Sequence, residues 1–278
     1  MKINTLILSG GGINCISLLG SFQYLFEENI IQKNFKGIQT IICVSGSIIN
    51  ILPLLLNFSI DAITKIFLSY DNLMNYDDFN INDIFNNFGL YNNKFIKNMV
   101  EILLSHKGYS KNLTLEELFK ITKKKLIIKV VNLSQNKIVY ISHKSNPNIK
   151  VSTVCCMTTC IPIFFQPILY KNNYFVDGGL CGNLPIDYIH NKTKYKDYLA
   201  INIISTKEKS IETFQDYLLS IFRTPFSPYD HRKNKKIVTI QMDEIGLDLN
   251  STKDKKTQKY KQGYIQTKEH FNNQTQIY

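Results

Sequence analysis

The sequence predicts an α/β fold, a three-layer sandwich with a mostly parallel central sheet. Two observations support this. Short β-branched apolar runs such as KINTLIL and IQTIICV alternate with segments whose apolar residues recur at helical spacing. The chain has 278 residues, of which 44% are hydrophobic, so one large domain can bury a sizeable core.

We expect a single domain over residues 1–278. No internal repeat or low-complexity linker divides the chain. The residues that carry recognisable motifs fall within 3–190. The basic remainder, 191–278, is expected to pack on the same domain.

The first half of the chain predicts two strands and four helices. The apolar runs give strands at 2–8 and 38–44. Helical spacing gives helices at 13–29, 47–58, 60–73 and 92–106, with Pro53 as a kink or break in the second of them.

The second half begins with a helix start signal, because Thr114 precedes Glu117 by three residues and forms a capping box. KKLIIKVVNL and NKIVYIS predict a hairpin, and QPILYKNNYFVDGG predicts another with Asn172 and Asn173 at its turn. Further elements are expected as a strand at 198–204, helices at 210–222 and 256–272, and a mobile loop at 226–236.

The charge of the chain favours anionic partners. The formal net charge is +11, and residues from 190 onward hold sixteen Lys or Arg against ten Asp or Glu. A solvated basic face explains this as simply as an anion-binding surface does. Nucleic-acid binding would rest on charge alone, because no zinc-finger spacing or RNP-type aromatic motif is present.

We expect an intracellular, cytoplasmic protein without a metal or cofactor. No secretory signal is visible, and the longest apolar run, 48–56, is too short for a membrane span. The six cysteines are expected to be free thiols. Cys155, Cys156 and Cys160 cluster but lack a C-x2-C pair with a histidine partner, and no acidic calcium loop is present.

Three glycines, Gly10, Gly11 and Gly12, lie between the first strand and the first helix. Such a turn can direct backbone N–H groups at an anion. Neither a P-loop lysine nor a G-x-G-x-x-G pattern follows. A nest for a developing oxyanion remains, with a simple tight turn as the alternative.

Ser45 follows the second strand and precedes a helical run, the context of a nucleophile elbow. The usual pattern is G-x-S-x-G, because residues two before and two after the serine crowd each other. Here Cys43 and Ser47 occupy those positions, both small, with Gly46 directly after the serine. Centring the elbow on Ser47 would place bulky Ile49 in the turn. A helix N-cap serine is the competing interpretation.

Asp177 ends a predicted strand and is followed by two glycines. Backbone donors at such a turn can orient its carboxylate, which could then take a proton from a serine hydroxyl. An ordinary Asp-Gly turn is the alternative. His190, His231 and His270 come late enough to complete a Ser-Asp-His order, but none has a flanking motif.

Together these pieces resemble the patatin-like phospholipases. The resemblance covers most of 3–190 and includes GLYNNKFIKNMVEILL, VSTVCCMTTCIPIFFQPI and the D-G-G with N-x-P of VDGGLCGNLPI. The order Ser45-Gly46-Ser47 looks more like the cytosolic phospholipase A2 branch than the plant patatins.

The resemblance implies a lipid acyl hydrolase of the phospholipase A or lysophospholipase type with a Ser-Asp dyad. Ser45 would be the nucleophile and Asp177 the general base, and the N–H groups of Gly11 and Gly12, with Gly10, would hold the oxyanion. The implied partners are a phospholipid or lysophospholipid and a membrane surface contacted peripherally. Headgroup preference and oligomeric state are not predicted.

Two departures from the family pattern favour an alternative. The family loop carries Arg or Lys where this chain has Asn14, and Cys43 replaces the first elbow glycine. A catalytically weak or inactive protein that binds lipid or a partner on the same fold would explain both. The apolar segments 161–168 and 222–229 are candidates for contact with a bilayer.

Overall fold

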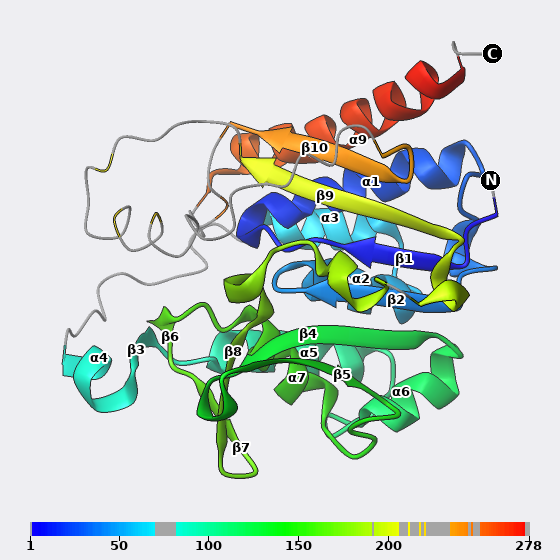
Figure 1. The fold of residues 1–278 in the computed structure, drawn as a ribbon. Coiled ribbons are helices and arrows are strands. Elements are labelled where there is room, and N and C mark those ends of the chain that lie inside the picture. The colour runs from blue at the N-terminus through cyan, green and yellow to red at the C-terminus, as the bar shows by residue number, and fades with distance from the viewer. Residues whose placement is uncertain are drawn as a thin grey trace.

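The computed structural model describes residues 2–69, 82–190, 192–205, 234–243 and 251–275, together with residues 211, 217, 220 and 246. Within them, eight strands form one sheet in the order β10-β9-β1-β2-β4-β8-β7, and β5 pairs with β4 (Figure 1). These strands are β1 (Thr5–Leu8), β2 (Thr40–Val44), β4 (Lys125–Asn132), β5 (Lys137–Ser142), β7 (Ile168–Tyr170), β8 (Asn173–Asp177), β9 (Tyr198–Ser205) and β10 (Ile237–Met242). A second, two-stranded sheet pairs β3 (Gly89–Tyr91) with β6 (Ile163–Phe165).

The five strands from β10 to β4 run parallel, and β5, β8 and β7 add antiparallel pairs at one side. The expectation of an α/β fold with a mostly parallel sheet is therefore confirmed. The described helices are α1 (Ile16–Glu27), α2 (Ser47–Leu55), α3 (Ile60–Ser69), α4 (Asn82–Asn87), α5 (Lys94–His106), α6 (Leu115–Thr122), α7 (Val151–Thr159) and α9 (Lys253–Thr275).

The two faces of the sheet bury different partners. Leu6, Leu8 and Ile41 face the main core, which is shared with α1, α2, α3, α5, α6, α7 and α9. Ile7 and Ile42, of opposite parity, face the segment 184–189, which forms a thin layer of turns. Because side chains alternate along a strand, buried strands of a parallel sheet need apolar residues on both faces.

Most expected elements are present with shifted ends. The capping box of Thr114 and Glu117 is formed at the start of α6, and β4 and β5 make the predicted hairpin. Pro53 lies inside α2, which ends two residues later. The helix expected to run to 73 is described only as far as Ser69.

One expected turn needs correction, and one strand of the main sheet was not predicted. The second hairpin turns at Lys171 and Asn172, both with positive φ, so Asn173 belongs to β8 rather than to the turn. The strand β10 was not expected, although its sequence IVTIQM is rich in β-branched residues. The helix expected at 210–222 and the loop at 226–236 fall almost entirely outside the described residues.

The pairing of β4 explains why two chemically important strand ends meet. β2 pairs with residues 125–129 of β4, β8 pairs with residues 130–132, and β5 overlaps both on the opposite edge. β2 and β8 therefore lie end to end along one edge of β4. Their last residues, Val44 and Asp177, stand opposite the adjacent residues Lys129 and Val130.

None of the helices in the described part of the chain combines the length and apolar character needed to cross a bilayer.

Candidate active site

Ser45 occupies a strained turn between β2 and α2. Its φ is +57°, in the left-handed region that non-glycine residues rarely adopt, and its side chain is buried. Its N–H donates to Thr158 Oγ1 at 2.8 Å. The Ser45 hydroxyl does not cap α2, whose N-cap residue is Gly46. This geometry is that of an elbow and not of an N-cap serine.

The elbow is built without its usual two glycines. Cys43 is fully buried in the main core, and burial raises the pKa of its thiol well above the ordinary value. Ser47 closes the turn, since its hydroxyl donates to the Val44 carbonyl at 2.6 Å and accepts from the Val44 N–H at 3.1 Å. Gly46 is required, because a β-carbon there would lie 2.8 Å from the Gly12 carbonyl oxygen.

Asp177 is the hydrogen-bond partner of Ser45. The Ser45 hydroxyl donates to Asp177 Oδ2 at 2.5 Å, and the Gly179 N–H donates to the other carboxylate oxygen at 2.7 Å. Burial raises the pKa of Asp177 to about 7, against the lowering effect of these hydrogen bonds and of the charge on Lys129. A carboxyl with such a pKa can accept and return a proton near neutral pH.

The glycine loop passes directly beside Ser45. A β-carbon on Gly10 would lie 2.8 Å from the Ser45 β-carbon, so only glycine allows this approach. The Gly10 N–H donates to the Asn183 carbonyl at 3.0 Å, and the Asn183 side-chain amide donates to the Gly10 carbonyl at 2.9 Å. For the Gly11 and Gly12 N–H groups, no backbone acceptor is found within the described residues.

Asn14 stands where the family pattern would place Arg or Lys, and a cation reaches it from elsewhere. Lys259 of α9 donates from Nζ to Asn14 Oδ1 at 2.7 Å, and both residues are buried. The glycine loop therefore has an ammonium group beside it that is contributed by α9.

An apolar cavity of about 130 Å³ opens beside Ser45. Its described lining carries no charged side chain and comes mainly from α2, α3 and α5. The residues are Gly12, Ile13, Ile16, Ser45, Gly46, Ile49, Asn50, Pro53, Ile63, Ile66, Phe67, Phe95, Ile96, Met99, Leu103, Thr159, Ile161 and Phe165. Of the two segments considered for bilayer contact, 161–168 contributes Ile161 and Phe165, whereas 222–229 lies outside the described residues.

Histidines and cysteines do not add a catalytic group to the described site. His270 bonds the Lys235 carbonyl at 3.1 Å, His190 is exposed, and His231 lies outside the described residues. The cysteines are free thiols, and Cys155 and Cys160 are fully buried in α7 and at its end. Within the described residues, no group of three or more His, Cys, Asp or Glu side chains could hold a metal ion.

Sequence reasoning missed four residues that support the site: Lys129, Thr158, Asn183 and Lys259. Asn183 belongs to the N-x-P motif, which by itself predicts no contact with the glycine loop. Thr158 lies in a run of small residues with no motif of its own. Lys129 and Lys259 carry no local signal, because their contacts are made with segments far away in the chain.

The family model described as patatin-like phospholipase matches residues 6–190. The chain belongs to this family. The probable lipid hydrolase 463L of Invertebrate iridescent virus 6 is 33% identical over 222 residues, which are 77% of this chain and 74% of that protein. The uncharacterized protein R571 of Acanthamoeba polyphaga mimivirus is 30% identical over 187 residues, or 66% of this chain and 61% of that protein.

Solved structures share the fold of this patatin-like chain. VipD from Legionella pneumophila superposes with a TM-score of 0.67 at 15% identity, covering 98% of this chain and 67% of VipD. The type III effector ExoU, from Pseudomonas aeruginosa, gives a TM-score of 0.54 at 14% identity. Its alignment covers 98% of this chain but only 53% of ExoU.

Proposed function

We propose that this protein is a lipid acyl hydrolase of the phospholipase A or lysophospholipase type, with Ser45 as nucleophile and Asp177 as general base. One observation carries the proposal. The Ser45 hydroxyl, which lines an apolar cavity, donates a 2.5 Å hydrogen bond to a buried carboxylate. Membership of the patatin-like phospholipase family supports the same chemistry.

In the proposed reaction, Asp177 takes the hydroxyl proton while Ser45 Oγ attacks the ester carbonyl carbon. The negative charge that develops on the carbonyl oxygen is stabilised by the N–H groups of Gly11 and Gly12. Gly10 has a different part, since its N–H is already donated to Asn183. Collapse of the tetrahedral intermediate expels the alcohol, which receives the proton from Asp177.

The second half repeats these steps with water. Asp177, ionised again, removes a proton from a water molecule that attacks the acyl-enzyme carbonyl. The fatty acid leaves, and the Ser45 oxygen recovers its proton from Asp177. Because the base must be ionised, we expect hydrolysis to decline as pH falls below about 7, the pKa to which burial raises Asp177.

The cavity indicates which part of the substrate enters. Its described lining is uncharged and largely aliphatic or aromatic, which suits an acyl chain and not a charged headgroup. The headgroup would then remain outside, toward solvent or the membrane.

Exposed apolar side chains on neighbouring segments are our candidate surface for peripheral membrane contact. We define the apolar rim as Phe85, Phe88, Leu169 and Tyr174, all exposed. The Phe88 and Tyr174 rings contact edge to face with centroids 5.9 Å apart, and Leu169 pairs with Tyr174 between β7 and β8. Phe88 leads into β3, which pairs with β6, and β6 supplies Phe165 to the cavity.

The test combines a fluorophosphonate probe with hydrolysis of phosphatidylcholine vesicles. We expect wild type to form an adduct at Ser45 and to release fatty acid. Ser45→Ala should form no adduct, and Asp177→Asn should lower both labelling and hydrolysis by at least about 10³-fold. Ser47→Ala is the matched control, since the Ser47 hydroxyl bonds the Val44 N–H and the carbonyls of Val44 and Leu8 and makes no bond to Asp177.

Hydrolysis that survives Ser45→Ala would reject this nucleophile. A wild-type protein that binds vesicles, forms no adduct and releases no fatty acid would instead support a lipid-binding protein without activity.

A further inference from the structure

Lys129 lies between the two strands that end at the candidate catalytic residues. On β4 it stands opposite Val44, the residue before Ser45, and its neighbour Val130 stands opposite Asp177. Its side chain is only 1% exposed. Burying an ammonium costs free energy unless each of its N–H donors has a hydrogen-bond acceptor. The acceptors of Lys129 therefore need to be identified.

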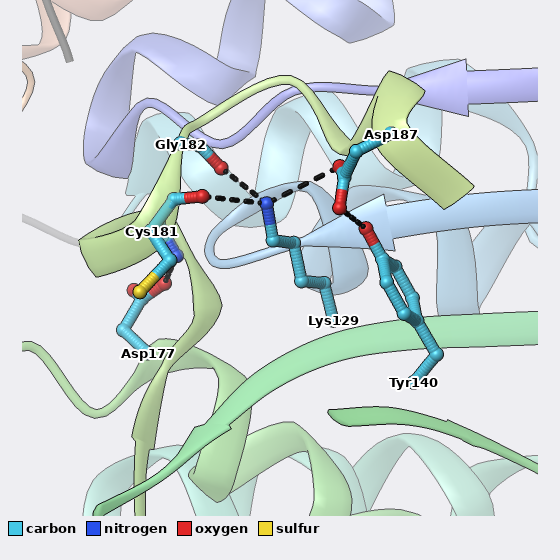
Figure 2. A network of polar contacts seen from close by, with 7 residues as sticks. Lys129, Tyr140, Asp177, Cys181, Gly182 and Asp187 are labelled. Carbon is cyan, nitrogen blue, oxygen red and sulfur yellow. Dashed lines mark hydrogen bonds and ion pairs between the residues drawn. The ribbon is translucent and has the colours of Figure 1, made fainter. Parts of the chain in front are cut away.

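The Lys129 ammonium has three acceptors, which match its three donors (Figure 2). It donates to the carbonyl oxygens of Cys181 at 2.8 Å and Gly182 at 3.0 Å. Its third partner is Asp187 Oδ1 at 3.4 Å. The two carbonyls belong to the turn that begins at Asp177, so the ammonium fixes the course of the chain just after the candidate base.

The main chain of Lys129 reaches the candidate nucleophile. Its carbonyl accepts from the Thr158 hydroxyl at 2.8 Å, and the same Thr158 oxygen accepts the Ser45 N–H at 2.8 Å. Gly178 packs directly against the Lys129 carbonyl, where a β-carbon would overlap it. One residue therefore supports Ser45 through its backbone and the turn after Asp177 through its side chain.

We propose that Lys129 is a positioning residue for the Ser45–Asp177 pair: its ammonium holds the turn 177–182, and its backbone carbonyl holds Thr158 against the Ser45 N–H. The inference rests on the proposed function for the meaning of that pair. The contacts themselves do not depend on it.

The charges around Asp177 support this role. Three groups lower the Asp177 pKa against the effect of burial: the Ser45 hydroxyl, the Gly179 N–H and the Lys129 ammonium on β4. Among the described residues, Lys129 is the cation that acts in this way. The nearby thiols of Cys15 and Cys160 have pKa values raised by burial and remain neutral. Burial lowers the pKa of Lys129, whereas Asp187, Cys181 and Asp177 raise it.

Asp187 is the outer member of the network. It is 48% exposed, and its second oxygen accepts from the Tyr140 hydroxyl at 2.6 Å. Burial and Asp187 both raise the pKa of Tyr140, so this hydroxyl remains protonated. Asp187 and Tyr140 can therefore be changed without touching Ser45 or Asp177.

The experiment is a ¹³C NMR titration of the full chain labelled at aspartate carboxyls, with Asp177 identified by the resonance that Asp177→Asn removes. We expect Lys129→Met to raise the Asp177 pKa by about one unit, since an opposite charge is lost. With a soluble ester, kcat should fall roughly 10–100-fold with little change in KM, because the cavity is untouched. Tyr140→Phe changes no charge and should leave the titration as in wild type.

Lys129→Gln also removes the charge but keeps amide donors for the Cys181 and Gly182 carbonyls, so the Asp177 pKa should again rise. This variant takes the place of Lys129→Met if circular dichroism shows that Lys129→Met does not fold. An Asp177 titration that is the same in wild type and in the folded variant without the charge would overturn the proposal. A wild type without probe adduct or hydrolysis would reject the proposed function alone, because the titration is read without turnover.

Discussion

At the scale of single residues, Asp177 is the proposed general base, and its ionisation lowers the stability of the folded chain. Its carboxyl is buried, and burial raises its pKa from 3.8 to about 7. A buried carboxylate that must ionise opposes folding, because the native state holds the proton more tightly than the unfolded chain does. Candidate catalytic residues are often the places where stability is lower than it could be.

The sign of this effect is testable. Since the native pKa lies above the unfolded value, the contribution of Asp177 to stability is present below about pH 4 and is lost as pH rises to about 7. Asp177→Asn removes the ionisation and can still accept from the Gly179 N–H. We expect its melting temperature to exceed that of wild type at pH 8 by at least about 2 °C, and by less at pH 5.

Differential scanning calorimetry at the two pH values makes this measurement, with exposed Asp61→Asn as the control for the substitution. A difference between Asp177→Asn and wild type that is equal at pH 5 and pH 8 would contradict a raised pKa at Asp177.

At the scale of elements, α9 packs against α1 at the distance of a backbone contact. A β-carbon on Gly20 of α1 would overlap the Tyr260 carbonyl, and one on Gly263 of α9 would overlap the Ser17 carbonyl. The Thr267 hydroxyl of α9 also donates to Ser21 Oγ of α1 at 2.9 Å. The two helices follow each other closely in Figure 1, although they come from opposite ends of the chain. This packing is what brings Lys259 to the glycine loop.

Gly263→Ala tests this packing through the sign of its effect. Inside a helix, Gly→Ala normally stabilises by about 1 kcal/mol. Here the overlap with the Ser17 carbonyl should reverse the sign, so we expect the free energy of unfolding to fall by at least about 1 kcal/mol. Urea denaturation gives the value, and Gln258→Ala on the exposed side of α9 is the control. A more stable Gly263→Ala protein would show that α9 does not pack this closely.

At the scale of the whole molecule, the apolar rim and the cavity indicate how the protein would approach a membrane. The arrowheads of β9 and β10 lie on the same side of Figure 1 as α4, β3 and β6. The segments α4, which contains Phe85, and β3, which follows Phe88, are therefore on the side toward which these parallel strands point. A protein that contacts a bilayer through this rim would bind a phospholipid without removing the whole molecule from the bilayer.

We expect the double variant Phe88→Ser, Leu169→Ser to bind phosphatidylcholine vesicles at least about tenfold more weakly, because two exposed apolar side chains no longer insert. Hydrolysis of a soluble ester should be unchanged, since neither side chain lines the cavity. Vesicle co-sedimentation measures the binding. Ile121→Ser on α6, where the apolar side chain is also exposed, is the control, and equal losses in both variants would argue against a role for the rim.

Much of the fold could be read from local patterns. The runs at β1 and β2, the hairpin of β4 and β5, and the capping box of Thr114 and Glu117 all rest on interactions between residues close in sequence. The same holds for the strained turn at Ser45, which needs only small neighbours and a glycine. β10 was not predicted, because a single short β-branched run gives only a weak signal for a strand.

By itself, the sequence determined the fold class and the family and singled out Ser45 and Asp177 as candidates, since periodicity, turn chemistry and short motifs are written in neighbouring residues. Only the tertiary structure decided that β2 and β8 share one edge of β4, which brings that hydroxyl and that carboxylate within hydrogen-bond distance. It also decided that Lys129 supplies a cation to the turn 177–182 and that Lys259 supplies one beside the glycine loop 10–12. Burial and long-range pairing create these contacts, and no spacing along the chain encodes them.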